Sequence, residues 1–111
     1  MPIYNKLVRD RIPEIIAKSD KRLTSRILSN DEYLIEINKK MHEELAEYEE
    51  AVLNENSEDA IEELADLLEL IHAAASVYDT TIEELERIRE DKADKRGGFD
   101  ERIYLIEVLD D

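Results

Sequence analysis

The chain has 111 residues, of which 42% are hydrophobic and 41% charged, with only two glycines and two prolines. This composition is typical of a helical, well-solvated domain and argues against a disordered chain. The formal net charge of −15 argues against a broad basic face that binds nucleic acid polymers, and the lack of cysteine excludes disulfides and thiolate chemistry.

The sequence has no apolar run of about 18 residues, the length needed to span a membrane. Its N-terminus also lacks the apolar segment of a signal peptide. We therefore expect one domain over residues 1–111, located in the cytoplasm and without a membrane partner.

The N-terminal part predicts one short helix and one short strand. Pro13 suits the first turn of a helix, which we predict over about residues 13–19. Residues 22–28 alternate weakly and include β-branched side chains, a pattern that favours a strand.

A long helix is predicted from the region of Ser29–Glu32 to about Leu53. Its start combines cap-forming residues with acids in the first turn. Apolar residues then recur at spacings of three and four and form one stripe, which comprises Leu34, Ile37, Met41, Leu45, Tyr48 and Val52.

The next helix is predicted over residues 58–78, after the polar break at Asn54–Ser57, with Ser57 as its cap. It carries two apolar stripes, so its later half is apolar over most of its circumference. The first stripe is Ile61, Leu64, Leu68, Ile71, Ala75 and Tyr78, and the second is Leu67, Leu70, Ala74 and Val77. Such a helix is expected to pack on several sides or across a subunit interface.

A third long helix is predicted from Ile82, with cations near its end and Gly97-Gly98 as its stop. Residues 102–109 then alternate like a strand. Their most economical partner is the predicted strand at 22–28, which gives a small β-hairpin beside the helices. The expected fold is thus an all-α bundle with this hairpin added.

Two acidic pairs, Glu44 with Glu47 and Glu63 with Asp66, lie on consecutive predicted helices. Residues three apart share one face of a helix, so an antiparallel arrangement would bring all four carboxylates together. Glu63 also continues the second apolar stripe, where an unpaired charge would be costly. Because crowded carboxylates repel and hard cations prefer oxygen ligands, the pattern predicts a Mg²⁺ site, with Mn²⁺ as a substitute.

Several cations are candidates for binding phosphate near such a site. They are Lys6, Arg9, Arg11, Lys95 and Arg96. The alternative is that Arg9 and Arg11 form surface ion pairs of little energetic value. For Lys95 and Arg96 the alternative is a favourable interaction with the C-terminal end of a helix.

The acidic motif Glu44-x-x-Glu47 … Glu63-x-x-Asp66 resembles the metal motif of the MazG-like all-α nucleoside triphosphate pyrophosphohydrolases. That superfamily includes dimeric dUTPases and phosphoribosyl-ATP pyrophosphohydrolase. The opening segment 4–16 and the closing segment 92–99 resemble a compact subgroup of predicted house-cleaning enzymes. The three segments occur in this order between residues 4 and 99, so the resemblance extends over nearly the whole chain.

The resemblance implies a MazG-like helical bundle that hydrolyses the α–β phosphoanhydride of a nucleoside triphosphate, releasing the monophosphate and pyrophosphate. It also implies a homodimer or a dimer of dimers. The implied Mg²⁺ ligands are Glu44, Glu47, Glu63 and Asp66. Glu47 would accept a proton from the attacking water, and Glu43 would act outside the direct ligand set. Lys95 and Arg96, with Arg9 or Arg11, would steady the leaving pyrophosphate.

Two other functions fit the sequence. The first is the phosphoribosyl-ATP pyrophosphohydrolase of histidine biosynthesis, which cleaves the same bond with the same metal. The second is a non-catalytic helical interaction protein whose acids are merely solvated. This second alternative explains Glu62 and Glu69 well and Glu63 poorly.

Overall fold

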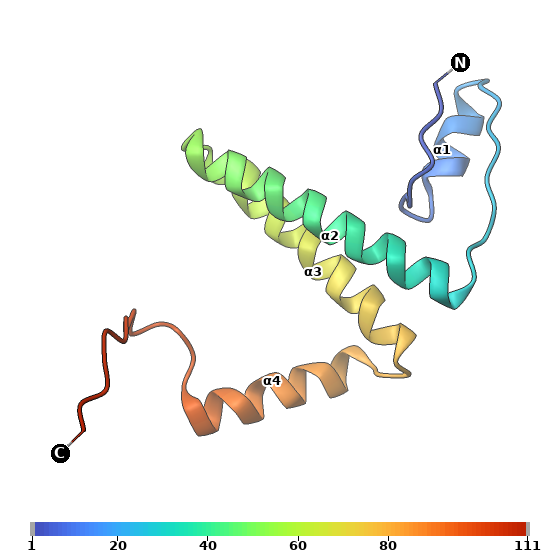
Figure 1. Cartoon of the computed structure of the whole chain (residues 1–111). Helices are drawn as coiled ribbons and strands as arrows, with labels where there is room; N and C mark the ends of the chain where they lie inside the picture. Colours follow the sequence, from blue (N-terminus) through green and yellow to red (C-terminus); the bar gives the residue numbers. More distant parts are fainter. Residues whose placement is uncertain (1, 111) are drawn as a thin grey trace.

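The computed structural model describes residues 2–110 and contains helices as its regular structure (Figure 1). These helices are α1 (Ile12–Lys18), α2 (Asn30–Leu53), α3 (Ser57–Val77) and α4 (Ile82–Arg96). The predicted all-helical class is confirmed, and each helix lies within one or two residues of its expected range. None of the described helices is long and apolar enough to cross a membrane.

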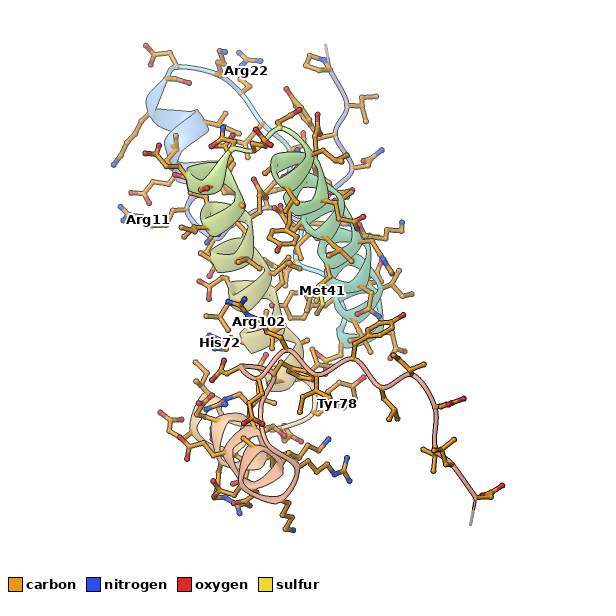
Figure 2. The ribbon with its side chains drawn as sticks, turned by 90° about the vertical axis from the view of Figure 1, so that its left-hand side faces the viewer. Arg11, Arg22, Met41, His72, Tyr78 and Arg102 are labelled. Carbon is orange, nitrogen blue, oxygen red and sulfur yellow. The ribbon has the colours of Figure 1, made fainter. Side chains whose placement is uncertain are left out.

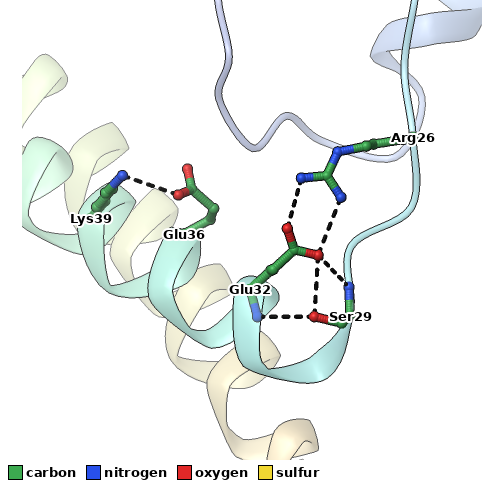
Figure 3. Close-up of polar contacts among 5 residues, drawn as sticks. All are labelled: Arg26, Ser29, Glu32, Glu36 and Lys39. Carbon is green, nitrogen blue, oxygen red and sulfur yellow. Dashed lines mark hydrogen bonds and ion pairs between the residues drawn. The ribbon is translucent and has the colours of Figure 1, made fainter.

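The start of α2 is fixed by a network of polar contacts (Figure 3). Ser29 and Glu32 form a capping box, in which the Ser29 hydroxyl accepts from the Glu32 backbone amide and the Glu32 carboxylate accepts from the Ser29 amide. Arg26 donates to both oxygens of the same carboxylate, at 3.2 and 2.7 Å. These bonds lower the pKa of Glu32 to about 2, and the hydrogen bonds from Arg26 have the largest effect.

The helices α2 and α3 form an antiparallel hairpin and lie side by side along most of their length (Figure 1). Asn56 caps α3 by accepting from the amide of Asp59, so the expectation that Ser57 is the cap is wrong. Met41 points between the two helices (Figure 2). Within residues 2–110 the buried apolar residues are few: Ile37, Ala51, Leu70 and Ala75.

The helix α4 leaves this hairpin at the turn after Val77 and extends away from it (Figure 1). Thr81 caps its start by accepting from the Glu84 amide. Gly97 follows its last residue with a φ of 81°, a left-handed conformation in which glycine has no Cβ to clash. The predicted glycine stop is confirmed.

The predicted β-hairpin is wrong, because neither 22–28 nor 102–109 forms a strand. The two segments lie at opposite ends of the molecule, one beside α1 and the other beyond α4 (Figure 1). A strand needs a hydrogen-bonded neighbour, and an isolated two-stranded pair is only marginally stable. The first segment is instead tied to α2 through the Arg26–Glu32 ion pair.

Replacing Ser29 by alanine should lower the free energy of unfolding by about 1 kcal/mol, because it removes the capping oxygen of α2. The matched control is Ser57→Ala, which removes the same hydroxyl from the first turn of α3 but leaves its Asn56 cap intact. Urea unfolding followed by circular dichroism measures the free energy of unfolding of both variants. Equal losses in the two variants would contradict the assigned caps.

Candidate metal site

The hairpin of α2 and α3 brings three of the predicted ligands into one cluster. Glu44 projects from α2, and Glu63 and Asp66 project from adjacent turns of α3. One carboxylate oxygen from each lies within 4.8 Å of the others, and all three side chains are half-buried. Three carboxylates at this spacing can hold one hard divalent cation.

The fit of a cation is supported by two carboxylate oxygens that lack partners. Oε2 of Glu44 and Oε2 of Glu63 are buried and have no hydrogen-bond partner among the described residues. A buried polar atom without a partner costs free energy, and a buried charge without one costs more. A cation in the cluster would supply the missing interaction.

Crowding changes the acidity of Glu63. The nearby Glu44 carboxylate is the main reason that the pKa of Glu63 rises from its usual 4.5 to about 8. Partial burial raises the pKa further, as does Glu47. Such a raised pKa indicates a group held among like charges, which is the state that a bound cation relieves.

The remaining predicted acids differ in position. Glu47 is exposed on α2, outside the tightest cluster, yet close enough to Glu63 to affect its pKa. Glu43 is exposed and is not one of the clustered acids. The helix places Glu44 and Glu47 on neighbouring turns of one face, whereas Glu43 lies about 100° round from Glu44.

Arg9 is the predicted cation that reaches the cluster. Its Nη2 donates to Oδ1 of Asp66 at 2.5 Å, and its Nη1 lies 3.8 Å from a carboxylate oxygen of Glu69. These contacts join the N-terminal segment, residues 2–11 before α1, to α3; Arg9 and Asp66 are 57 positions apart in the sequence. Arg9 was a candidate for either phosphate binding or a surface pair, and it forms an ion pair with a candidate metal ligand.

The other predicted cations lie away from the acids. Lys6 lies over the ring of Tyr4, with its Nζ 5.5 Å from the ring centre. Arg11 pairs with Glu14 at 3.5 Å and points outward from the hairpin (Figure 2). Lys95 and Arg96 end α4, which leads away from the cluster within one chain (Figure 1).

Lys40 and Glu69 also border the cluster, and sequence reasoning did not select them for the site. A small cavity of about 40 Å³ beside the acids is lined by Arg9, Lys40, Glu44, Asp66, Glu69 and Leu70. Helix periodicity is the pattern by which the sequence indicates both residues. Lys40 precedes Glu44 by four residues and Glu69 follows Asp66 by three, so each shares a helix face with a clustered acid. The cluster therefore has positive charge from two directions, Arg9 and Lys40.

Comparison with protein families gives a match to the phosphoribosyl-ATP pyrophosphohydrolase model over residues 2–93, a range that contains all the clustered acids. The chain belongs to this family. The family is part of the MazG-like all-α superfamily that the acidic motif and the terminal segments resemble. The match also contains α1 to α3 and most of α4.

A search of curated proteins gives a shorter match. Over 42 residues the chain is 50% identical to an uncharacterized protein of Mycolicibacterium smegmatis. These residues are 38% of this chain and 43% of the relative, so the match spans less than half of either protein. No solved structure matches the chain.

The raised pKa of Glu63 predicts a pH dependence of stability in chelator-treated protein. The folded protein keeps this proton up to about pH 8, whereas an unfolded glutamate loses it near pH 4.5. Between these values the folded state binds more protons, so the free energy of unfolding should fall as the pH rises. In Glu63→Gln, which cannot titrate at this position, the fall should be much smaller.

Urea unfolding in EDTA at several values between pH 5 and 8 measures this dependence. Glu62→Gln is the matched control, since Glu62 is an exposed neighbour outside the cluster. It should keep the pH dependence of the wild type. If Glu63→Gln keeps it too, the proton is not held at Glu63.

Proposed function

We propose that this protein is a magnesium-dependent nucleoside triphosphate pyrophosphohydrolase with a house-cleaning role in the cytoplasm. It cleaves the α–β phosphoanhydride of a non-standard nucleotide and releases the monophosphate and pyrophosphate. The observation that carries the proposal is the cluster of Glu44, Glu63 and Asp66, with its two unpartnered buried oxygens, in a member of this family.

In this proposal Glu44, Glu63 and Asp66 hold Mg²⁺, and Glu47 completes the ligand set from the adjacent turn of α2. A bound Mg²⁺ neutralises phosphate charge and makes a water molecule more acidic. Glu47 is the most exposed of these acids and accepts the proton of the attacking water. Glu43, one residue before Glu44, faces solvent and can act only outside the direct ligand set.

In this proposal the cations beside the acids bind the phosphates of the substrate. Arg9 and Lys40 line the small cavity at the cluster, where they can compensate charge on the leaving pyrophosphate. Lys6 and Arg11 lie on either side of Arg9 in the sequence and remain candidates for binding phosphate. Lys95 and Arg96 could act on phosphate only in the site of another copy of the chain, because α4 leads away from the cluster (Figure 1).

The protein is proposed to be a homodimer or a dimer of dimers. The first apolar stripe of α3 is largely exposed, including Ile61, Leu64, Leu68, Ile71 and Tyr78. The radius of gyration is 18.8 Å, whereas a compact domain of this length would have about 13 Å. A helical hairpin with this much exposed apolar surface needs a partner to cover it, and a second copy offers the same stripe.

The second candidate is the phosphoribosyl-ATP pyrophosphohydrolase of histidine biosynthesis. The matching family carries this name, and the same acids would serve the same bond cleavage. A non-catalytic interaction protein is a weaker candidate, because solvated acids do not account for two buried oxygens without partners.

Pyrophosphate release tests the proposal. The wild type is assayed with standard and damaged nucleoside triphosphates and with phosphoribosyl-ATP, each with Mg²⁺ and with EDTA. Glu63→Gln should reduce the metal-dependent rate at least 100-fold, since it replaces a charged ligand by a neutral amide of similar shape. Glu62→Gln should keep the wild-type rate.

A thermal melt with Mg²⁺ or Mn²⁺ provides a readout that does not depend on the substrate. Metal that binds only the folded state must raise the melting temperature of the wild type and of Glu62→Gln, but much less that of Glu63→Gln. Fastest release from phosphoribosyl-ATP would select the second candidate. No release from any substrate, with no metal-dependent shift, would favour the interaction protein.

Leu68→Glu tests the dimer, because it places a charge in the exposed apolar stripe of α3. Light scattering should give the wild type a mass of two chains or more, and should give the variant a larger monomer fraction. Ile27→Glu is the matched control at an exposed site outside α3 and should keep the mass of the wild type. A wild type that is monomeric at all concentrations would overturn the proposed assembly.

A further inference from the structure

A larger cavity of about 340 Å³ lies between the N-terminal segment, α1 and α2. Its volume falls within the range of small-molecule sites, roughly 300–1,000 Å³. Apolar side chains supply part of its lining, namely Val8 before α1 and Ile12 and Ile16 within α1. It can therefore take an apolar or aromatic group.

Among the described residues, every charged residue that lines this cavity is a cation. They are Lys6, Arg9 and Lys40. Acids outnumber bases 30 to 15 in the chain, so a cavity without a lining carboxylate departs from the average charge of the protein. This lining favours a ligand that carries negative charge as well as an apolar part.

The cavity adjoins the acidic cluster. Arg9 and Lys40 line both this cavity and the 40 Å³ cavity beside Glu44 and Asp66. A ligand that begins against the apolar residues and passes these two cations therefore arrives at the candidate metal site. Its phosphates would lie where a cation held by the cluster can reach them.

Tyr4 contributes an aromatic ring to the cavity lining, and this residue is 68% exposed. Lys6 lies over this ring, 5.5 Å from its centre, so a cation and an aromatic face are presented together. Aromatic rings stack on every kind of nucleobase, and a lysine beside the ring can form an ion pair with a phosphate.

We propose that this cavity binds the nucleoside part of the substrate. The base packs against Tyr4 and the apolar residues of α1, and the phosphate chain runs past Lys40 and Arg9 to Glu44, Glu63 and Asp66. The inference rests on the proposed function. It adds the residues of the protein that distinguish a nucleotide from inorganic polyphosphate. The N-terminal segment is thus a substrate-binding element.

Binding measurements separate the base site from the phosphate site. Isothermal titration with Mg²⁺ compares two kinds of probe: the α,β-methylene analogues of ATP, GTP, CTP and UTP, which resist cleavage at the α–β bond, and inorganic tripolyphosphate, which lacks base and sugar. The wild type should bind at least one analogue more tightly than tripolyphosphate. Equal affinity for all five probes would overturn the proposal.

Tyr4→Ala should weaken binding of the tightest analogue about 5- to 150-fold, the effect of losing one base–aromatic stack, and leave the affinity for tripolyphosphate unchanged. Tyr104→Ala is the matched control, because this exposed tyrosine lies in the C-terminal segment. Lys40→Gln should weaken both kinds of probe, while Lys39→Gln, whose lysine pairs with Glu36, should weaken neither.

These outcomes distinguish the two proposals. If the wild type releases pyrophosphate and Tyr4→Ala keeps wild-type affinity for the analogue, the cavity is not the nucleoside site but the enzymatic function stands. If Tyr4→Ala weakens analogue binding while the wild type releases no pyrophosphate, the cavity binds nucleotides and the proposed reaction fails. Tyr4 is exposed, so its variant should fold, and circular dichroism checks this.

Discussion

The packing of α2 against α3 is the constraint on which the candidate site depends. Apolar contacts around Ile37 and Leu70 hold the two helices together, and the same packing brings three carboxylates within 4.8 Å. Two like charges at this distance repel by about 3 kcal/mol at an effective dielectric constant of about 20. Protonation of Glu63, which its raised pKa favours, relieves part of this repulsion, and a divalent cation would relieve more. Apolar burial thus stabilises an arrangement that electrostatics alone would oppose.

The N-terminal segment is connected to this site by Arg9. An exposed ion pair such as Arg9–Asp66 contributes little to stability, so its importance lies in position rather than in free energy. Arg9 lines both cavities and touches a candidate metal ligand. Phosphate bound beside the cluster would compete with Asp66 for the same guanidinium group. One side chain therefore links the acids of the hairpin to the cationic, apolar cavity beneath the N-terminal segment.

The exposed stripe of α3 explains why the single chain has few buried residues. One apolar stripe of this helix packs against α2, whereas much of the other faces solvent. Exposed apolar surface of this extent is unfavourable in water, and α4 covers little of it because it diverges from the hairpin (Figure 1). Assembly with a second copy would bury the stripe and could also bring the cationic end of one α4 towards the acids of another subunit.

The sequence by itself determined the helices, because their caps, stops and apolar periodicities are local properties. Ser29, Thr81 and Gly97 mark helix ends through contacts within a few residues. The spacing of the acids within each helix likewise followed from 3.6 residues per turn, so Glu44, Glu63 and Asp66 could be selected. Only the tertiary structure decided which groups meet across the chain. It paired Arg9 with Asp66, added Lys40 to the site and separated the two segments expected to form a hairpin. Such contacts depend on how distant elements pack, and periodicity within one element carries no information about its neighbour in space.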